Sequence, residues 1–134
     1  MSEVLYSIEH ANAALPLLRA IVTDVVRLEH TIVTTTRAYR RLKADPRKPQ
    51  AELNYAQREL GELVAERDAC AAELSELGVR LGDAARGVCD FPSELDGEPV
   101  YLCWELGEER VEFYHALDAG YGERLPLPIP AGVS

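Results

Sequence analysis

Two matched heptad patterns, separated by a short turn with two prolines, are the feature that most constrains how this chain can fold. The first pattern steps alternately by three and four residues through Leu18, Ile21, Val25, Leu28, Ile32, Thr35, Tyr39 and Leu42. The second steps in the same way through Leu53, Ala56, Leu60, Leu63, Arg67, Cys70, Leu74 and Leu77. This spacing places each set on one face of a helix, and a short connection forces the second helix back along the first. The sequence therefore predicts a long antiparallel two-helix coiled-coil hairpin over about residues 8–78.

Local signals mark the ends of the two predicted helices. Ser7 is a good N-cap, because its hydroxyl can accept a hydrogen bond from a first-turn N–H. Pro46 and Pro49 cannot continue a helix and mark the turn, and Gly78 suits the position just after the second helix. Pro16 lies too deep for a first-turn proline, so we expect a kink or break between residues 12 and 16.

The hydrophobic pattern changes from helical to alternating in the C-terminal third. Val100, Leu102 and Trp104 alternate with other residues, and a glycine-containing turn leads to a second alternating segment at residues 111–115. This pattern predicts an antiparallel β-hairpin inside the region of about residues 88–125.

The remaining segments complete the predicted fold. An isolated β-hairpin is marginally stable, so residues 3–6 could add a short N-terminal strand to a small sheet. Residues 126–134 contain three prolines and no charge, and we expect an extended tail there. The predicted fold class is α+β, mostly α, in a single domain over residues 1–134.

Charge and cysteine content narrow the functional classes. The net charge is −9, which disfavours binding of nucleic acid or anionic lipid over the whole surface. Three cysteines without close pairing indicate reduced thiols, and the basic-poor N-terminus is not a secretory signal, so we expect a cytoplasmic protein. No apolar run is long enough to span a membrane. The predicted hairpin tip is nevertheless basic; its cations are Arg37, Arg40, Arg41, Lys43, Arg47 and Lys48.

The C-terminal third also resembles a known bacterial family, the domain of unknown function 2203. The segments that carry the resemblance are 88–92, 100–104 and 106–108, and the likeness extends from Ala11 to Arg124. The resemblance implies a family signature that would here be Tyr114-His115, Asp118 and Gly120-Tyr121, with Tyr114 in place of a tryptophan and His10 in place of an acid. It implies no activity, but it suggests that the C-terminal segment carries whatever is specific to the protein.

Four residues form the candidate ligand or metal site: Glu108, His115, Asp118 and Arg124. A histidine held by a carboxylate can act as a base or a metal ligand, and a nearby arginine can hold an anion. The alternative is structural, with His115 capping the sheet and an Asp118–Arg124 pair holding a loop. A zinc site from Cys89, Cys103, His115 and a carboxylate is disfavoured, since these residues lack the close ligand pairing typical of structural zinc.

No segment carries a catalytic motif, so the leading hypothesis is a non-enzymatic interaction or scaffold module that forms a homodimer. Val22, Val26 and Val33 lie off the heptad seam and are candidates for the dimer surface, although they could also pack on the sheet. The alternatives are a small ligand-binding or divalent-metal domain, with or without enzyme activity, and contact with a nucleic-acid backbone through the basic tip. We predict no cofactor. A second copy of the chain is the expected partner, and nucleic acid is disfavoured as one.

Overall fold

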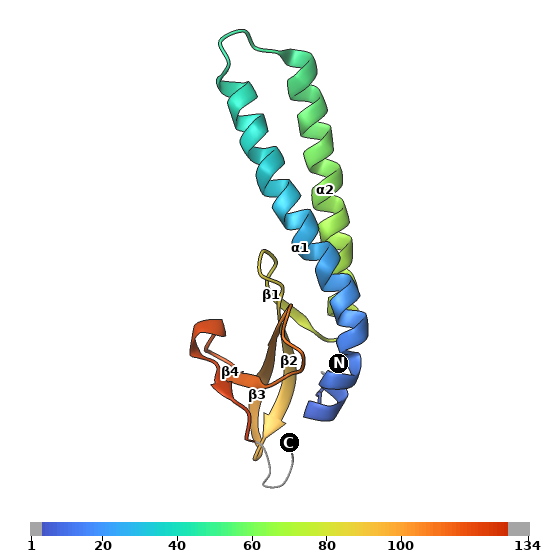
Figure 1. Ribbon diagram of the computed structural model, residues 1–134, viewed down its shortest axis with the longest axis vertical. Helices are drawn as coiled ribbons and strands as arrows, with labels where there is room; N and C mark the ends of the chain where they lie inside the picture. The colour runs from blue at the N-terminus through green and yellow to red at the C-terminus, as the bar shows by residue number, and fades with distance from the viewer. Residues whose placement is uncertain (1–3, 129–134) are drawn as a thin grey trace.

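The computed structural model, which describes residues 4–128, is an elongated molecule with a helical arm and a sheet at one end of it (Figure 1). Helix α1 (Ile8–Ala44) and helix α2 (Gln50–Glu76) pack against each other as an antiparallel hairpin. The prolines lie in the connecting turn, and Gly78 follows α2 with a φ of +79°. The predicted hairpin is confirmed.

The start of α1 agrees with the sequence at its cap and differs at Pro16. The Ser7 hydroxyl accepts a hydrogen bond of 3.0 Å from the His10 N–H, as an N-cap does. The helix then continues through Pro16, so of the predicted kink or break, the break is wrong. Leu15 and Leu18 on either side are buried in the core. Packing of these neighbours holds the helical path, although the proline removes one backbone donor.

The sheet contains five antiparallel strands in chain order. They are β1 (Arg80–Asp83), β2 (Val88–Leu95), β3 (Glu98–Glu105), β4 (Phe113–Ala116) and β5 (Leu125–Pro126), with a 3₁₀ helix η1 (Tyr121–Glu123) before β5. The predicted pairing of the segments around 100–105 and 111–115 is present as β3 and β4, with Tyr101 opposite His115.

The longest pairing, between β2 and β3, was not predicted. These strands are joined by Asp96 and Gly97, both with positive φ, which is the geometry of a two-residue hairpin turn. The Asp-Gly pair was a usable signal.

The predicted N-terminal strand is wrong within the described residues. Residues 4–7 form no strand; Tyr6 donates one backbone hydrogen bond of 2.7 Å to the Pro92 carbonyl, and Ser7 then begins the helix. The predicted tail begins differently too, since Leu125–Pro126 form β5 and Leu127 is buried. Glu3 and residues 129–134 lie outside the described residues.

One face of the sheet builds the core against the helices. Phe91, Leu102 and Trp104 are fully buried there and pack with Leu18 and Leu74 of the helices. The opposite, outer face carries the residues that alternate with these along the strands. Neither helix in residues 4–128 combines the length and apolar character that a membrane crossing requires.

Two of the residues proposed for a dimer surface are instead covered within the chain. Val22 is 0% exposed, and Val26 packs against the edge of the core. Both contact the turn before β2, where Gly87 approaches them closely. Only Val33 of the three is exposed. The apolar surface that α1 has beyond its heptad seam therefore packs on the sheet near Gly87. Packing on the sheet was the alternative to a dimer surface for these valines.

Candidate functional site

The outer face of the sheet holds a buried polar cluster. Strand register places Arg80 opposite Asp90, Asp90 opposite Cys103, and Tyr101 opposite His115. Side chains in these positions point to the face away from the helices, because each alternates with a core residue. The segment around η1 lies over this face and brings Arg124 to Cys103.

Asp90 is at the centre of the cluster. Its side chain is 4% exposed, and its two oxygens have different partners. Oδ2 accepts a hydrogen bond of 2.6 Å from Arg80, whose guanidinium also lies 4.1 Å from the centroid of the Tyr101 ring. Oδ1 lies 3.0 Å from Nε2 of His115. These two partners offset the cost of removing the Asp90 carboxylate from water, because they satisfy its lone pairs.

The orientation of the His115 ring constrains its protonation. The side chain is 1% exposed, and Nδ1 lies 2.8 Å from the carbonyl oxygen of Ala116. A carbonyl can only accept, so Nδ1 must carry the proton of this hydrogen bond. Nε2 and Asp90 Oδ1 would therefore both be acceptors, facing each other, unless a proton or another cation lies between them.

Cys103 completes a group of three ligand atoms. One donor atom from each of Asp90, Cys103 and His115 lies within 4.8 Å of the other two, and all three residues are buried. Burial, reinforced by the Asp90 charge, raises the pKa of the Cys103 thiol to about 12. The thiol is therefore protonated at neutral pH in the chain alone.

Arg124 and Glu108 form a second unit beside this group. Their bidentate ion pair has N···O distances of 3.1 and 2.7 Å. The Arg124 guanidinium lies against the rings of Phe113 and Tyr121, 4.1 and 4.3 Å from their centroids. Such a clamped guanidinium is a rigid part of the structure.

The structure brings together some of the residues proposed from the sequence and separates others. Glu108 and Arg124 are paired, while His115 is bound to Asp90. Asp118 is exposed and makes no hydrogen bond or ion pair with the part of the chain that the structure describes. Cys89 faces the helical core, so it cannot join Cys103 and His115 in one site. Asp90 was the missed residue; its alternation with Cys89 and Phe91 was the signal.

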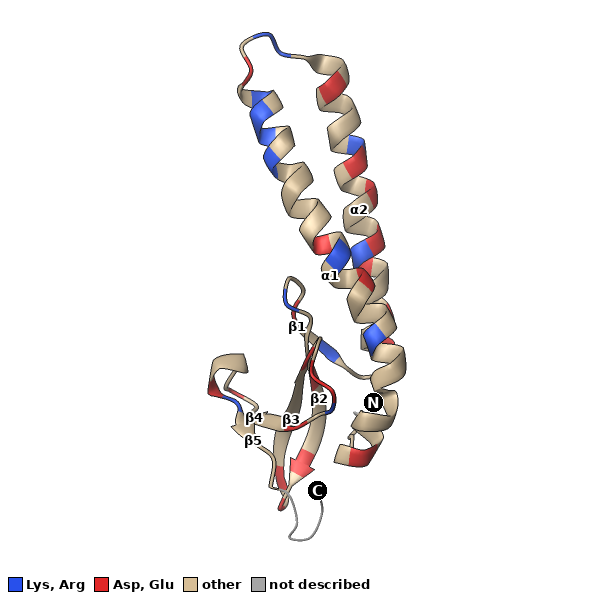
Figure 2. Cartoon of the chain, in the orientation of Figure 1, with Lys and Arg blue, Asp and Glu red and all other residues tan. Residues whose placement is uncertain are grey.

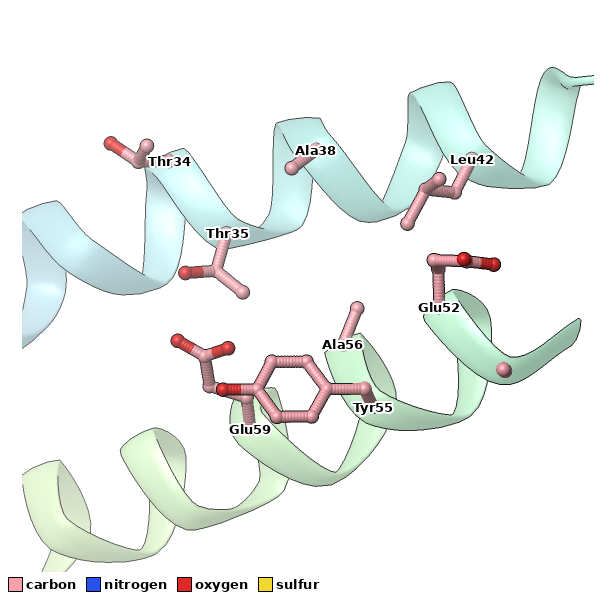
Figure 3. Close-up of a pocket in the computed structure, with 9 residues that line it drawn as sticks. Thr34, Thr35, Ala38, Leu42, Glu52, Tyr55, Ala56 and Glu59 are labelled. Atoms are coloured by element: carbon pink, nitrogen blue, oxygen red, sulfur yellow. The ribbon is translucent and has the colours of Figure 1, made fainter. Parts of the chain in front are cut away.

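A groove in the outer half of the hairpin is a second feature. It has a volume of about 480 Å³ and lies between α1 and α2 near the tip. Thr35 and Leu42 of α1 and Ala56 of α2 point into it, and the Tyr55 ring lies along its edge (Figure 3). Small residues along this part of the seam leave the helices without close packing, and Tyr55 is 64% exposed.

The three thiols should differ in reactivity towards a thiol reagent in the native protein. Burial raises the pKa of Cys89 to about 12 as well, whereas Cys70 on the hairpin is only partly buried. We expect Cys70 to react first and Cys89 and Cys103 only after denaturation, because attack requires an accessible thiolate. Counting released chromophore with and without urea checks this. Rapid reaction of all three thiols in the native chain would contradict the buried sheet faces.

Comparison with known proteins places the chain in a family. A family model described as "Uncharacterized conserved protein (DUF2203)" matches residues 4–127. No curated protein matches the chain. No solved structure matches it either.

Proposed function

We propose that this chain, which belongs to the DUF2203 family of uncharacterised conserved proteins, is an interaction module that pairs with a second copy of itself through the outer half of its hairpin. The observation that carries the proposal is the arm itself. It projects away from the sheet (Figure 1), and its seam opens into the groove lined by Thr35, Ala38, Leu42 and Ala56. An open apolar seam on a projecting helix pair is a surface suited to another helix pair.

Charge complementarity favours a second copy as the occupant. The C-terminal end of α1 is basic, while acidic residues lie along α2 (Figure 2). Helix α2 carries seven acidic residues against Arg58 and Arg67 only. In a two-fold pairing the same surface of both copies meets, so the basic helix of one arm can lie against the acidic helix of the other.

This pairing also accounts for the basic tip without nucleic acid. Arg41 and Lys43 lie in the last turn of α1, where the helix dipole favours cations. Lys48 donates a hydrogen bond of 3.2 Å to the Lys43 carbonyl, and Arg47 is held by Asp45. These contacts give the tip a structural role within the arm, and its remaining charge matches the acidic helix of a partner arm.

The mass of the protein in solution tests the proposal. We expect light scattering at micromolar concentration to give twice the 14.8 kDa of one chain. An Ala38→Glu change should return the mass to that of one chain, because it places an unpaired carboxylate on the groove that the partner would cover. Ala38 is exposed in the single chain, so helical content should stay the same.

The matched control is Ala65→Glu. Ala65 is an exposed alanine of α2 outside the groove, so the same substitution there should leave the mass of the pair unchanged. Raising the salt concentration should weaken the pair in wild type, because exposed charges on the two arms are screened. A wild-type mass of one chain, or an equal response of the two variants, would contradict the proposal.

A further inference from the structure

We propose that Asp90, Cys103 and His115 form a binding site for one divalent transition-metal ion of the zinc class. The three side chains come from the adjacent strands β2, β3 and β4 and lie on the outer face of the sheet. Thiolate, imidazole and carboxylate are the ligands that zinc uses in proteins. Because the three residues are on rigid paired strands, the donor atoms are held close together without a loop having to order.

The contact between His115 and Asp90 is the observation that points to a cation. With the Nδ1 proton donated to the Ala116 carbonyl, Nε2 faces Asp90 Oδ1 across 3.0 Å, a contact that requires a proton or a metal ion between the two atoms. Two acceptors at this distance repel unless a positive charge lies between them. The same arrangement, in which one ring nitrogen donates to a backbone carbonyl and the other is directed at a ligand position, is the usual one for metal-binding histidines.

The distances are close to those of a tetrahedral site. Metal–ligand bonds of about 2.0 Å to nitrogen and oxygen and about 2.3 Å to sulfur place the donor atoms of a tetrahedral site roughly 3.3–3.5 Å apart. The three donors of this cluster lie within 4.8 Å of one another, and the separation of Nε2 and Oδ1, 3.0 Å, has to widen by a few tenths of an ångström. Three protein ligands leave a fourth position for water or a small ligand.

The surrounding charges also fit a divalent ion. Arg80 binds Asp90 Oδ2, which leaves Oδ1 free to act as a single ligand. Arg124 lies 4.0 Å from the Cys103 sulfur, but its charge is matched by Glu108. Both guanidinium groups beside the cluster are thus paired with a carboxylate.

Titration with Co²⁺ and Zn²⁺ tests the site directly. The full chain is stripped of metal with a chelator, kept reduced, and studied in a Cys70→Ser background, which removes the partly exposed thiol of the arm. We expect one Co²⁺ per chain, with a near-ultraviolet absorption band from thiolate coordination and visible bands of tetrahedral intensity. Zn²⁺ should displace Co²⁺, abolish these bands and raise the melting temperature.

Cys103→Ala and Cys89→Ala form a matched pair of variants. Both cysteines are 0% exposed and lie on adjacent strands, but Cys89 faces the helical core and Cys103 the cluster. Cys103→Ala should lose the thiolate band and bind the metal roughly 100-fold more weakly or worse, while Cys89→Ala should keep both the band and the affinity. Asp90→Asn should weaken binding with the thiolate band retained at saturation.

Circular dichroism of each variant establishes that it is folded before its affinity is compared. Failure of the folded wild-type chain to take up one ion would overturn the proposal. So would equal losses in the Cys89→Ala and Cys103→Ala proteins. Either result would assign Asp90, His115 and Arg80 a purely structural role in the sheet.

Discussion

Replacing Gly87 with alanine is expected to lower the free energy of unfolding by about 3 kcal/mol. Gly87 has a φ of +74°, in the left-handed region that residues with a Cβ avoid. A Cβ at this position would lie 2.8 Å from Val22 Cγ1 and 2.9 Å from Leu106 Cβ. Neither neighbour can move freely, because Val22 is fully buried and Leu106 donates a backbone hydrogen bond to Gly87. The contact between the arm and the sheet therefore depends on Gly87 having no side chain.

Gly97→Ala is the matched control for this prediction. Gly97 has a similar φ of +80°, but a Cβ there would have no atom within 4 Å. The substitution should cost only the backbone part, about 1 kcal/mol. Urea unfolding followed by circular dichroism, at one fixed protein concentration, gives both values. Equal losses for the two variants would show that Gly87 is required for its backbone angle alone.

Replacing Asp90 with alanine, measured in the presence of a chelator, should also cost about 3 kcal/mol of unfolding free energy. The change leaves the Nε2 atom of His115 buried without a partner and removes the acceptor of Arg80. The histidine contributes most of the loss, since the Arg80 side chain is 50% exposed and can turn to water. Loss of the carboxylate should also disturb β4, which is held to β3 by only a short pairing.

Two further variants separate charge from hydrogen bonding. Asp90→Asn can still donate or accept a hydrogen bond at the same place, so it should cost less than Asp90→Ala. Asp118→Ala changes an exposed carboxylate without a partner in the described residues, and its effect should stay within about 0.5 kcal/mol. The same urea titration gives all three values. A loss at Asp118 as large as that at Asp90 would contradict the conclusion that Asp90 is the carboxylate that stabilises the sheet.

The candidate site shows where inference from the sequence succeeds and where it ends. His115 and Arg124 could be selected because a lone histidine and arginine near a strand end are chemically conspicuous. The partner of His115 could not be chosen correctly, since Asp118 and Glu108 are near it in the sequence while Asp90 is 25 residues away. Asp90 meets His115 only through the combined registers of β2, β3 and β4, and the second of these pairings has no two-residue turn that sets it.

The sequence by itself determined the arm. Heptad spacing, the prolines of the turn, the Ser7 cap and Gly78 are local signals, and they correctly placed both helices because helix geometry relates residues only three or four apart. Pro16 is the exception, since burial of its neighbours outweighed its local preference. Only the tertiary structure decided what covers Val22 and Val26, how five strands pair, and which acid meets His115. Each of these depends on contacts between residues distant in sequence, where the free energy comes from burial against surfaces that no single segment contains.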